Sequence, residues 1–207
     1  IKSVTNYLDD FRYSDSANTV YQFVWNQFCD WYLELIKPVL NGDDGAEKDE
    51  TRAVAAWVLD QILKILHPFM PFITEELWHA MGNERAEDLI LSSWPLLDVD
   101  VDEDARADMN WVISVITAIR AARAEANVPA GAKLPCFVRD AGEDLDTKLG
   151  AHEVVLKRLA RLDMITVDAN ADTNAALQVI VDGATYVLPL AGAIDLGAER
   201  ARLNKAI

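Results

Sequence analysis

Apolar residues recur every three or four positions between residues 11 and 40, and this spacing predicts one long helix with a single buried stripe. Ser14 and Asp15 are the candidate N-cap residues, because their side-chain oxygens can accept hydrogen bonds from the first turn. Pro38 and the pair Asn41 and Gly42 predict its end. The predicted stripe consists of Ala17, Val20, Val24, Phe28, Trp31 and Leu35.

The opposite face of this helix is lined with amides and aromatic rings. Four polar residues follow one another at intervals of four, namely Asn18, Gln22, Asn26 and Asp30, and the rings that flank them are Tyr21, Phe23, Trp25 and Tyr32. Amides donate and accept hydrogen bonds and exposed rings stack, which is what recognition of unpaired RNA bases requires. The same pattern is typical of a bundle helix whose polar face is solvated and whose rings are core. The pattern alone favours this simpler interpretation.

Further helices are predicted up to residue 127. One spans about 47–66, with a core side made of Val54, Trp57, Val58, Gln61, Ile62, Ile65 and Leu66. The next begins at Pro71 and ends at Gly82. Residues 84–104 are irregular, with apolar positions that predict a strap across the bundle at Leu89, Ile90, Leu91, Trp94 and Pro95. A helix over 102–126 follows, with a stripe of Trp111, Val112, Val115, Ile116 and Ile119.

The pattern changes after Gly131. Strands are predicted near 134–138 and 164–167, with a helix between them over 143–160. Residues 177–181 and 184–188 predict a hairpin closed by Asp182 and Gly183, and a charged helix begins near residue 195. The predicted fold class is therefore mainly α: a helical bundle over 1–127, then a small α+β module with a β-hairpin over 128–207.

The formal net charge of −15 argues at first against nucleic-acid binding, since phosphate contacts require Lys and Arg. Much of the acid lies in two segments, 43–50 and 98–104, and screening over roughly 8 Å lets such segments coexist with a local RNA site. Base stacking and amide hydrogen bonds also need little net charge. A more basic junction contains Arg120, Arg123, Lys133 and Arg139; phosphate contact and pairing with a helix C-terminus are equally good interpretations.

Several functional classes lack the residues they need. No Gly-rich phosphate loop and no convincing Ser/His/Asp or Cys/His set occurs, so no catalytic residue is predicted. His67 and His79 have no third ligand at a convincing spacing, so no metal site is predicted either. Cys29 and Cys136 are predicted to be reduced and buried. No apolar run reaches membrane-spanning length and no signal peptide is recognisable, which predicts a cytoplasmic protein.

Three segments carry a resemblance to a known family. They are FVWNQFCDWYLELIKP over 23–38, HPFMPFITEELW over 67–78, and Ile119 and Arg120 together with NVPAGAK over 127–133. In this order they resemble the anticodon-binding helix bundle of class I aminoacyl-tRNA synthetases, and specifically that of the valyl-tRNA synthetase family. The second segment is shared with the leucine and isoleucine enzymes. The resemblance covers roughly the first two-thirds of the chain.

The resemblance implies recognition of the anticodon stem-loop of tRNA-Val. It implies that ATP and Mg are used by a catalytic domain upstream, alongside an editing domain, so that this chain needs no cofactor and is inactive alone as a ligase. The lack of an initiator Met fits a fragment. Neither membrane nor DNA is an expected partner. The candidates for RNA contact are Arg12, Asn18, Tyr21, Gln22, Trp25 and Asn26, with Arg120, Arg123 and Lys133 as backbone contacts.

Two alternatives remain open. One is the corresponding bundle of the isoleucine or leucine enzyme, although the isoleucine enzyme typically ends in a cysteine-rich zinc module, with which two scattered cysteines disagree. The other is a non-catalytic helical scaffold that binds protein.

Overall fold

The computed structural model describes residues 1–82, 85–97 and 99–190. The chain forms two compact units, Ile1–Asp100 and Val101–Ile207. The first is helical and the second combines helices with a four-stranded sheet, so the expected fold class, mainly α with an α+β module, is confirmed. Among the described residues no helix is both long enough and apolar enough to cross a membrane. The final helix predicted near residue 195 lies outside the described residues.

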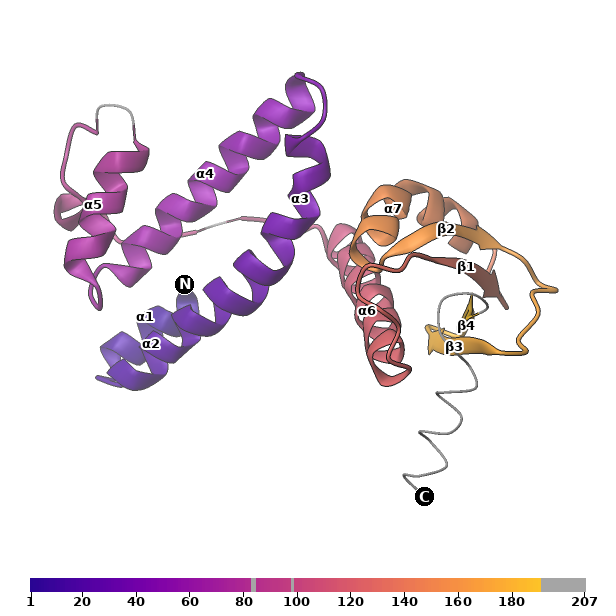
Figure 1. Ribbon diagram of the computed structural model, residues 1–207. Helices are drawn as coiled ribbons and strands as arrows, with labels where there is room; N and C mark the ends of the chain where they lie inside the picture. Colours follow the sequence, from indigo (N-terminus) through magenta and orange to yellow (C-terminus); the bar gives the residue numbers. More distant parts are fainter. Residues whose placement is uncertain (83–84, 98, 191–207) are drawn as a thin grey trace. The chain divides into compact units, whose positions relative to one another are not determined.

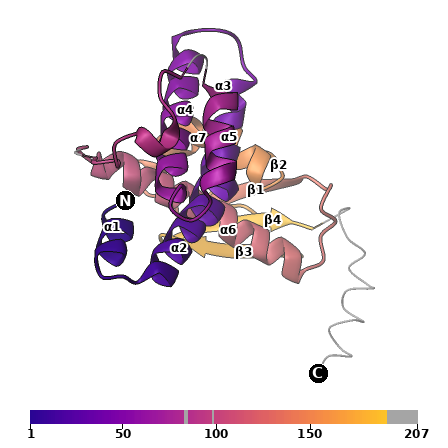
Figure 2. The same cartoon turned by 90° about the vertical axis from the view of Figure 1, so that its left-hand side faces the viewer.

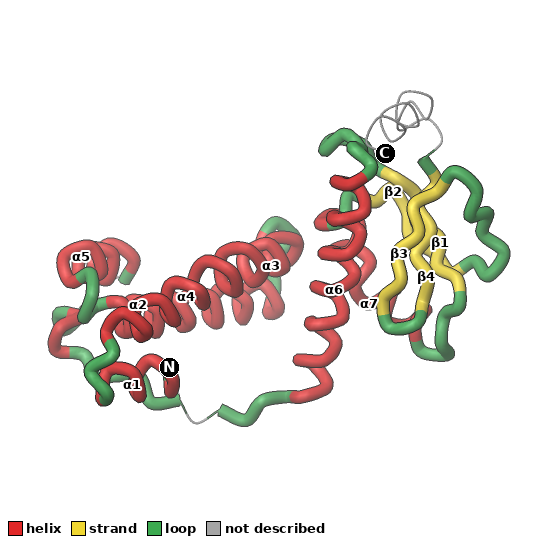
Figure 3. Tube along the Cα trace, turned by 90° about the horizontal axis from the view of Figure 1, so that it is seen from below, coloured by secondary structure: helices red, strands yellow, loops and turns green. Residues whose placement is uncertain are grey.

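The first unit is organised around a rod of three consecutive helical segments (Figure 1). Its elements are α1 (Lys2–Asp9), α2 (Tyr13–Gln22), the π-helix η1 (Phe23–Tyr32), α3 (Leu33–Leu40), α4 (Ala46–Leu66), α5 (Pro71–Met81) and the short 3-10 turn η2 (Leu89–Leu91). Gln22 and Leu33, at the two joints of the rod, keep helical backbone angles, so the chain passes from α2 to α3 without a break. Helix α4 returns alongside the rod, and both α2 and α3 contact it (Figure 3).

The long helix predicted over 11–40 is confirmed in extent but differs in detail. It begins after Arg12 rather than at Ser14 or Asp15, since Phe11 lies in a tight turn with φ +58° that reverses the chain between α1 and α2 (Figure 2). Its middle is a π-helix, in which the Leu33 N–H donates to the carbonyl of Phe28, five residues back. It also continues through Pro38 and ends at Leu40, just before the Asn41 and Gly42 pair.

Two apolar clusters form the core of this unit. In one, Val4, Val20 and Ile65 bring α1, α2 and α4 together, and Trp94 of the following segment packs against them. The Trp94 indole N–H also donates to Thr5 Oγ1 at 2.9 Å. In the other, Leu63, Trp78 and Leu89 join α4, α5 and η2. The strap predicted at Leu89 and Trp94 is therefore present, although Ile90 and Leu91 point to solvent.

Helix α4 agrees in length with the predicted helix but buries less of it than expected. Ile62 and Ile65 are buried, whereas Val54 and Trp57, both predicted for the core side, are 45% and 47% exposed. A stripe in the sequence shows which face is apolar, but not how far along the helix a partner covers it.

The second unit begins with the long helix α6 (Glu103–Glu125), as predicted, and the carboxylate of Asp102 accepts a hydrogen bond from the Ala105 N–H at its start. The remaining elements are β1 (Leu134–Arg139), α7 (Leu145–Leu159), β2 (Leu162–Val167), β3 (Ala176–Val181) and β4 (Ala184–Pro189). The sheet order is β2-β1-β4-β3. Strands β1 and β2 are parallel and joined through α7, while β4 is antiparallel to β1 and β3.

The predicted hairpin is confirmed. Val181 pairs with Ala184, and both residues of the turn, Asp182 and Gly183, have positive φ values of 48° and 82°. Two positive φ values identify a type I′ turn, whose twist matches that of the flanking strands. Asp followed by Gly is a favoured pair for this turn, which is why the sequence predicts it.

Helix α6 packs with the sheet of the second unit. It contacts α7 and β3, and both helices lie on the same side of the sheet (Figure 3). Its buried positions are Trp111, Val112, Val115, Ile116, Ile119 and Arg123. The two compact units divide near residue 100, and the domain division at residue 127 that the sequence pattern gives stays a prediction. The apolar stripe of α6 predicts burial correctly but does not identify the partner.

The two cysteines are expected to differ in reactivity. Cys136 in β1 is fully buried, and this burial raises the pKa of its thiol to about 12, whereas Cys29 is half-buried. Because the thiolate is the nucleophile, we expect iodoacetamide at about pH 8 to alkylate Cys29 in the folded protein and Cys136 only after unfolding. Peptide mass spectrometry would measure this order, and equal labelling of both thiols without denaturant would contradict it.

Candidate functional site

The polar face of the rod is accessible to solvent. Asn18, Gln22, Asn26 and Asp30 are all exposed, and the Asn26 amide donates a hydrogen bond to the Gln22 side-chain oxygen. The two central amides of the line are thus neighbours, and each keeps further donor and acceptor capacity. A line of amides presented in this way can hydrogen-bond to the edges of unstacked bases.

A hollow of about 570 Å³ lies beside the amides, between the rod and α4. Asn18 and Gln22 lie on its rim, together with Gln27 and the partly exposed rings of Phe23 and Trp57. Sequence reasoning missed Trp57 and Gln27 as possible members of this surface. Trp57 falls on the apolar stripe of α4, so the sequence contains no signal that separates it from the core.

Two further rings form an exposed stacked pair. The rings of Tyr21 and Trp25 are 6.3 Å apart between centroids and nearly parallel, with an interplanar angle of 6°. Both border a small apolar hollow of about 280 Å³ that α4 and the start of the next loop close off. Tyr32, by contrast, is half-buried against Phe28, and this burial raises the pKa of its phenol. Of the rings predicted beside the amide line, Tyr32 is therefore the least available for stacking.

Arg12 stands at the beginning of the rod and is exposed. Its Nε donates to the carboxylate of Asp15 at 2.9 Å, and its guanidinium lies 4.6 Å from the centre of the Tyr7 ring. An exposed ion pair of this kind contributes little stability, so Arg12 can exchange it for a phosphate at small cost.

The structure gives Arg123 a different role from the expected phosphate contact. This side chain is only 6% exposed, and it donates to the backbone carbonyls of Arg161, Pro129 and Ala132, the last at 2.6 Å. Burial, followed by the nearby positive charge of Arg161, lowers its pKa. Arg123 therefore holds the loop after α6 against the turn after α7, and its contact with RNA stays a prediction.

Arg120 and Lys133 belong to the second unit as well. Arg120 donates to the carbonyl of Leu159 at 2.8 Å, so it too contributes to packing between α6 and α7. Lys133 is exposed and borders a hollow of about 640 Å³ whose other basic residues are Lys157, Arg158 and Arg161. Glu153 and Asp163 line the same hollow, so its charge is mixed. Of the three predicted backbone contacts, Lys133 is the most accessible.

Of the two histidines that the sequence analysis considered as metal ligands, His67 lies at the end of α4 and His79 on α5. His67 pairs through Nδ1 with Thr74 Oγ1, and the carboxylate of Glu75 accepts hydrogen bonds from the N–H groups of Leu89 and Ile90. Glu75 thus caps the turn η2, a role that the sequence pattern did not predict. His79 meets Asp88, which the sequence places nine residues away in an irregular segment.

Comparisons with known proteins show what the chain is similar to. A family model described as the anticodon-binding domain of tRNA ligase matches residues 1–138. The chain is 56% identical over 200 residues to a valine–tRNA ligase of Rhizorhabdus wittichii, covering 96% of this chain and 22% of that protein. It is 51% identical to the valine–tRNA ligase of Zymomonas mobilis, covering all of this chain and 24% of that protein. It is 48% identical to the valine–tRNA ligase of Brucella suis, covering 99% of this chain and 22% of that protein. The chain thus spans less than a quarter of the length of these relatives.

Proposed function

The chain belongs to the family of anticodon-binding domains of tRNA ligases, and we propose on this premise that its helical unit binds the anticodon stem-loop of a tRNA. The observation that carries the proposal is the match of the family model to residues 1–138, which include the entire rod. The exposed amides and rings of the rod support it, because single-stranded loops are read by stacking and by hydrogen bonds to base edges.

In this proposal the rod contributes two kinds of contact. The amides of Asn18, Gln22 and Asn26 hydrogen-bond to the edges of splayed bases, and the Tyr21 and Trp25 pair offers a ring on which a base stacks. Arg12 at the start of the rod and Lys133 in the second unit contact phosphates. Because the chain carries a net charge of −15, the few cations that contact phosphates matter for its affinity. These phosphate contacts also make tRNA binding depend on salt concentration.

We further propose that the tRNA is tRNA-Val and that the chain acts as part of a valine–tRNA ligase in the cytoplasm. The relatives above carry that name and are 48–56% identical to this chain over the matched segment. The ATP- and Mg-dependent chemistry would belong to other domains of the longer enzyme. This chain would contribute by positioning, because fixing the anticodon end of the tRNA orients its acceptor end toward a distant catalytic centre.

A titration of the 207-residue chain with tRNA tests the proposal. We expect saturable binding to tRNA-Val, weaker binding to a tRNA with an unrelated anticodon, and a loss of affinity between about 50 and about 200 mM salt. Filter binding or fluorescence anisotropy would measure this. No binding at the lower salt concentration would reject the proposal in favour of a helical scaffold that binds protein, and equal affinity for the two tRNAs would reject valine specificity.

A variant that lacks the two central amides of the line tests whether this face contacts the tRNA. Gln22→Ala combined with Asn26→Ala is expected to weaken tRNA-Val binding about tenfold, because each lost hydrogen bond contributes about 0.5–1.5 kcal/mol. The melting temperature should stay unchanged, since both side chains are exposed and hydrogen-bond to each other. Asn6→Ala removes an exposed amide from α1 of the same unit and serves as the control. Equal binding by the double variant and this control would exclude the amide line from the interface.

A further inference from the structure

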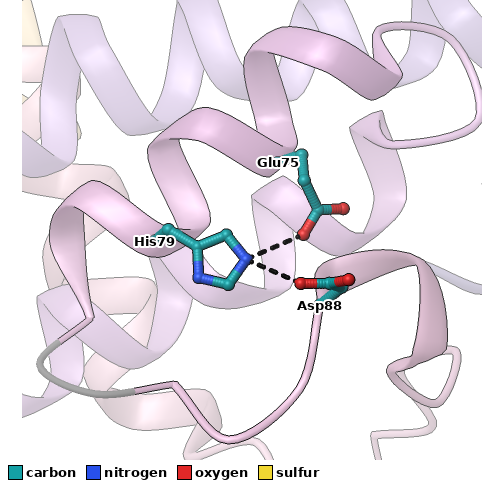
Figure 4. A group of neighbouring side chains, drawn as sticks. All are labelled: Glu75, His79 and Asp88. Carbon is teal, nitrogen blue, oxygen red and sulfur yellow. Dashed lines mark hydrogen bonds and ion pairs between the residues drawn. The ribbon is translucent and has the colours of Figure 1, made fainter.

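Three potential metal ligands converge beside helix α5, away from the polar face of the rod (Figure 4). The Nε2 atom of His79 lies 3.3 Å from Glu75 Oε1 and 3.0 Å from Asp88 Oδ1. All three donor atoms lie within 4.8 Å of one another.

The three side chains are held by the surrounding backbone. Glu75 and His79 are four residues apart on α5 and therefore share one face of that helix. The segment that carries Asp88 is fixed on both sides: the Trp78 indole donates to the Glu87 carbonyl at 3.0 Å, and the Glu75 carboxylate accepts from the Leu89 N–H at 2.6 Å. Trp78 and Leu89 are themselves buried together. Such outer contacts orient ligands before a metal binds.

The same segment is also tied to α4. Arg85 makes two hydrogen bonds to the carboxylate of Asp60, at 2.9 and 2.6 Å, and its guanidinium lies 3.7 Å from the centre of the Trp78 ring. Asp88 is therefore presented by a braced connection rather than by a free loop.

A second, independent observation points to a ligand in this place. His67 lines the same hollow of about 410 Å³ as Glu75, His79 and Asp88. The Thr74 hydroxyl donates to the Met70 carbonyl at 2.8 Å, so its oxygen accepts from His67 Nδ1, and the lone pair of the imidazole is on Nε2. That Nε2 atom is buried and has no hydrogen-bond partner among the described residues. A buried acceptor without a donor is costly, so His67 Nε2 is a polar atom beside this hollow that the described residues leave unsatisfied.

We propose that Glu75, His79 and Asp88 bind a divalent transition-metal ion such as Zn²⁺. Ligands at the usual zinc distances of about 2.0–2.2 Å in a tetrahedral site lie about 3.3–3.5 Å apart, close to the separations around His79. Imidazole combined with carboxylates selects zinc and its neighbours over Mg²⁺, which prefers oxygen ligands and water. The ion binds the Nε2 lone pair of a neutral His79 ring, whose one ring proton is then on Nδ1, and it replaces the contacts of Nε2 with the two carboxylates.

A metal at this position joins α5 to the segment 85–91, so its role is structural. It lies on side chains that the proposed RNA contacts do not use, and the two proposals stand or fall separately.

Cobalt is the direct probe, because Co²⁺ takes zinc sites and absorbs visible light. We expect the 207-residue chain to bind one equivalent of Co²⁺ with visible absorption bands, Zn²⁺ to displace it, and Mg²⁺ to leave the spectrum unchanged. Excess Zn²⁺ should raise the melting temperature by about 4 °C or more, since an ion that binds only the folded state stabilises it. Absence of Co²⁺ absorption would overturn the proposal.

Single substitutions identify the ligands. His79→Gln and Asp88→Asn are each expected to weaken Co²⁺ binding by at least about tenfold, with circular dichroism confirming that each variant is folded. His152→Gln is the matched control, since His152 contacts only one carboxylate, that of Asp108, which also pairs with Lys148. Equal Co²⁺ affinity for His79→Gln and the wild type, or an equal loss in His152→Gln, would reject the site.

Discussion

Replacing Tyr21 and Trp25 together by alanine is expected to weaken tRNA-Val binding by about 10- to 100-fold, since base stacking on an aromatic side chain contributes about 1–3 kcal/mol per base. The two rings lie nearly parallel on the surface, and each is 56% exposed. Their loss therefore removes stacking planes while the cores formed by Val20 and Ile65 stay intact.

Anisotropy titrations of both proteins at one salt concentration would measure the change in affinity. Phe72→Ala is the control, because Phe72 is an aromatic residue of the same unit and is 91% exposed on α5. If the double variant binds tRNA within about twofold of the control, the stacked pair does not contact bases.

Replacing Arg123 by alanine is expected to destabilise the second unit by about 2–4 kcal/mol. The guanidinium donates to three backbone carbonyls in two loops, and alanine removes all three of these hydrogen bonds. The carbonyls of Pro129 and Arg161 still accept from the N–H groups of Ala132 and Leu134, whereas the Ala132 carbonyl loses its short bond to Arg123. The repulsion between Arg123 and Arg161, which contributes to the lowered pKa of Arg123, offsets only part of that loss.

Hydrogen exchange along a urea series, read in peptides covering β1 and β4, would measure this change within the second unit. Arg106→Ala on the same helix is the control, since Arg106 is exposed and its ion pair among the described residues is with Glu103, one turn away. Its effect should stay below about 1 kcal/mol. Equal unfolding midpoints for the two variants would show that Arg123 does not hold the loops.

Much of the fold could be predicted from apolar periodicity and from turn residues. The spacing of Val20, Val24 and Phe28 predicts the rod, and the Asp182 and Gly183 pair predicts the hairpin. Apolar spacing and turn residues depend only on neighbouring positions in the chain, so a single sequence is enough to recognise them. The π-helical middle of the rod was not predictable, because side chains four residues apart share a face in either kind of helix.

What the pattern could not supply is the identity of the packing partner. Trp57 and Trp111 both lie on apolar stripes, yet Trp57 is half exposed and Trp111 is buried beside α7. Arg123 illustrates the same limit for polar residues. A basic residue in the last turn of a helix can contact a phosphate or donate hydrogen bonds to backbone carbonyls. The sequence does not distinguish these roles, whereas the structure shows the carbonyls of Pro129, Ala132 and Arg161 beside Arg123.

The sequence predicted some features of the candidate sites and not others. The amides and the stacked rings follow from helix geometry, and their exposure agrees with that expectation, while their contact with RNA stays a prediction. The convergence on His79 could not be predicted, because Asp88 reaches it through an irregular segment whose path depends on Trp78 and Glu75.

The wide turns of η1 restrict how the rod can change in evolution. A π-type turn holds nearly one residue more than an α-type turn, so the ten residues of η1 turn through a smaller angle than ten α-helical residues would. Deleting one residue between Phe23 and Tyr32 without changing this winding would rotate every side chain from Leu33 onward by about a quarter turn relative to Tyr21. Substitutions in the first and last thirds of the rod are thus tolerated independently, whereas a change of length in the middle alters the phase of one end against the other.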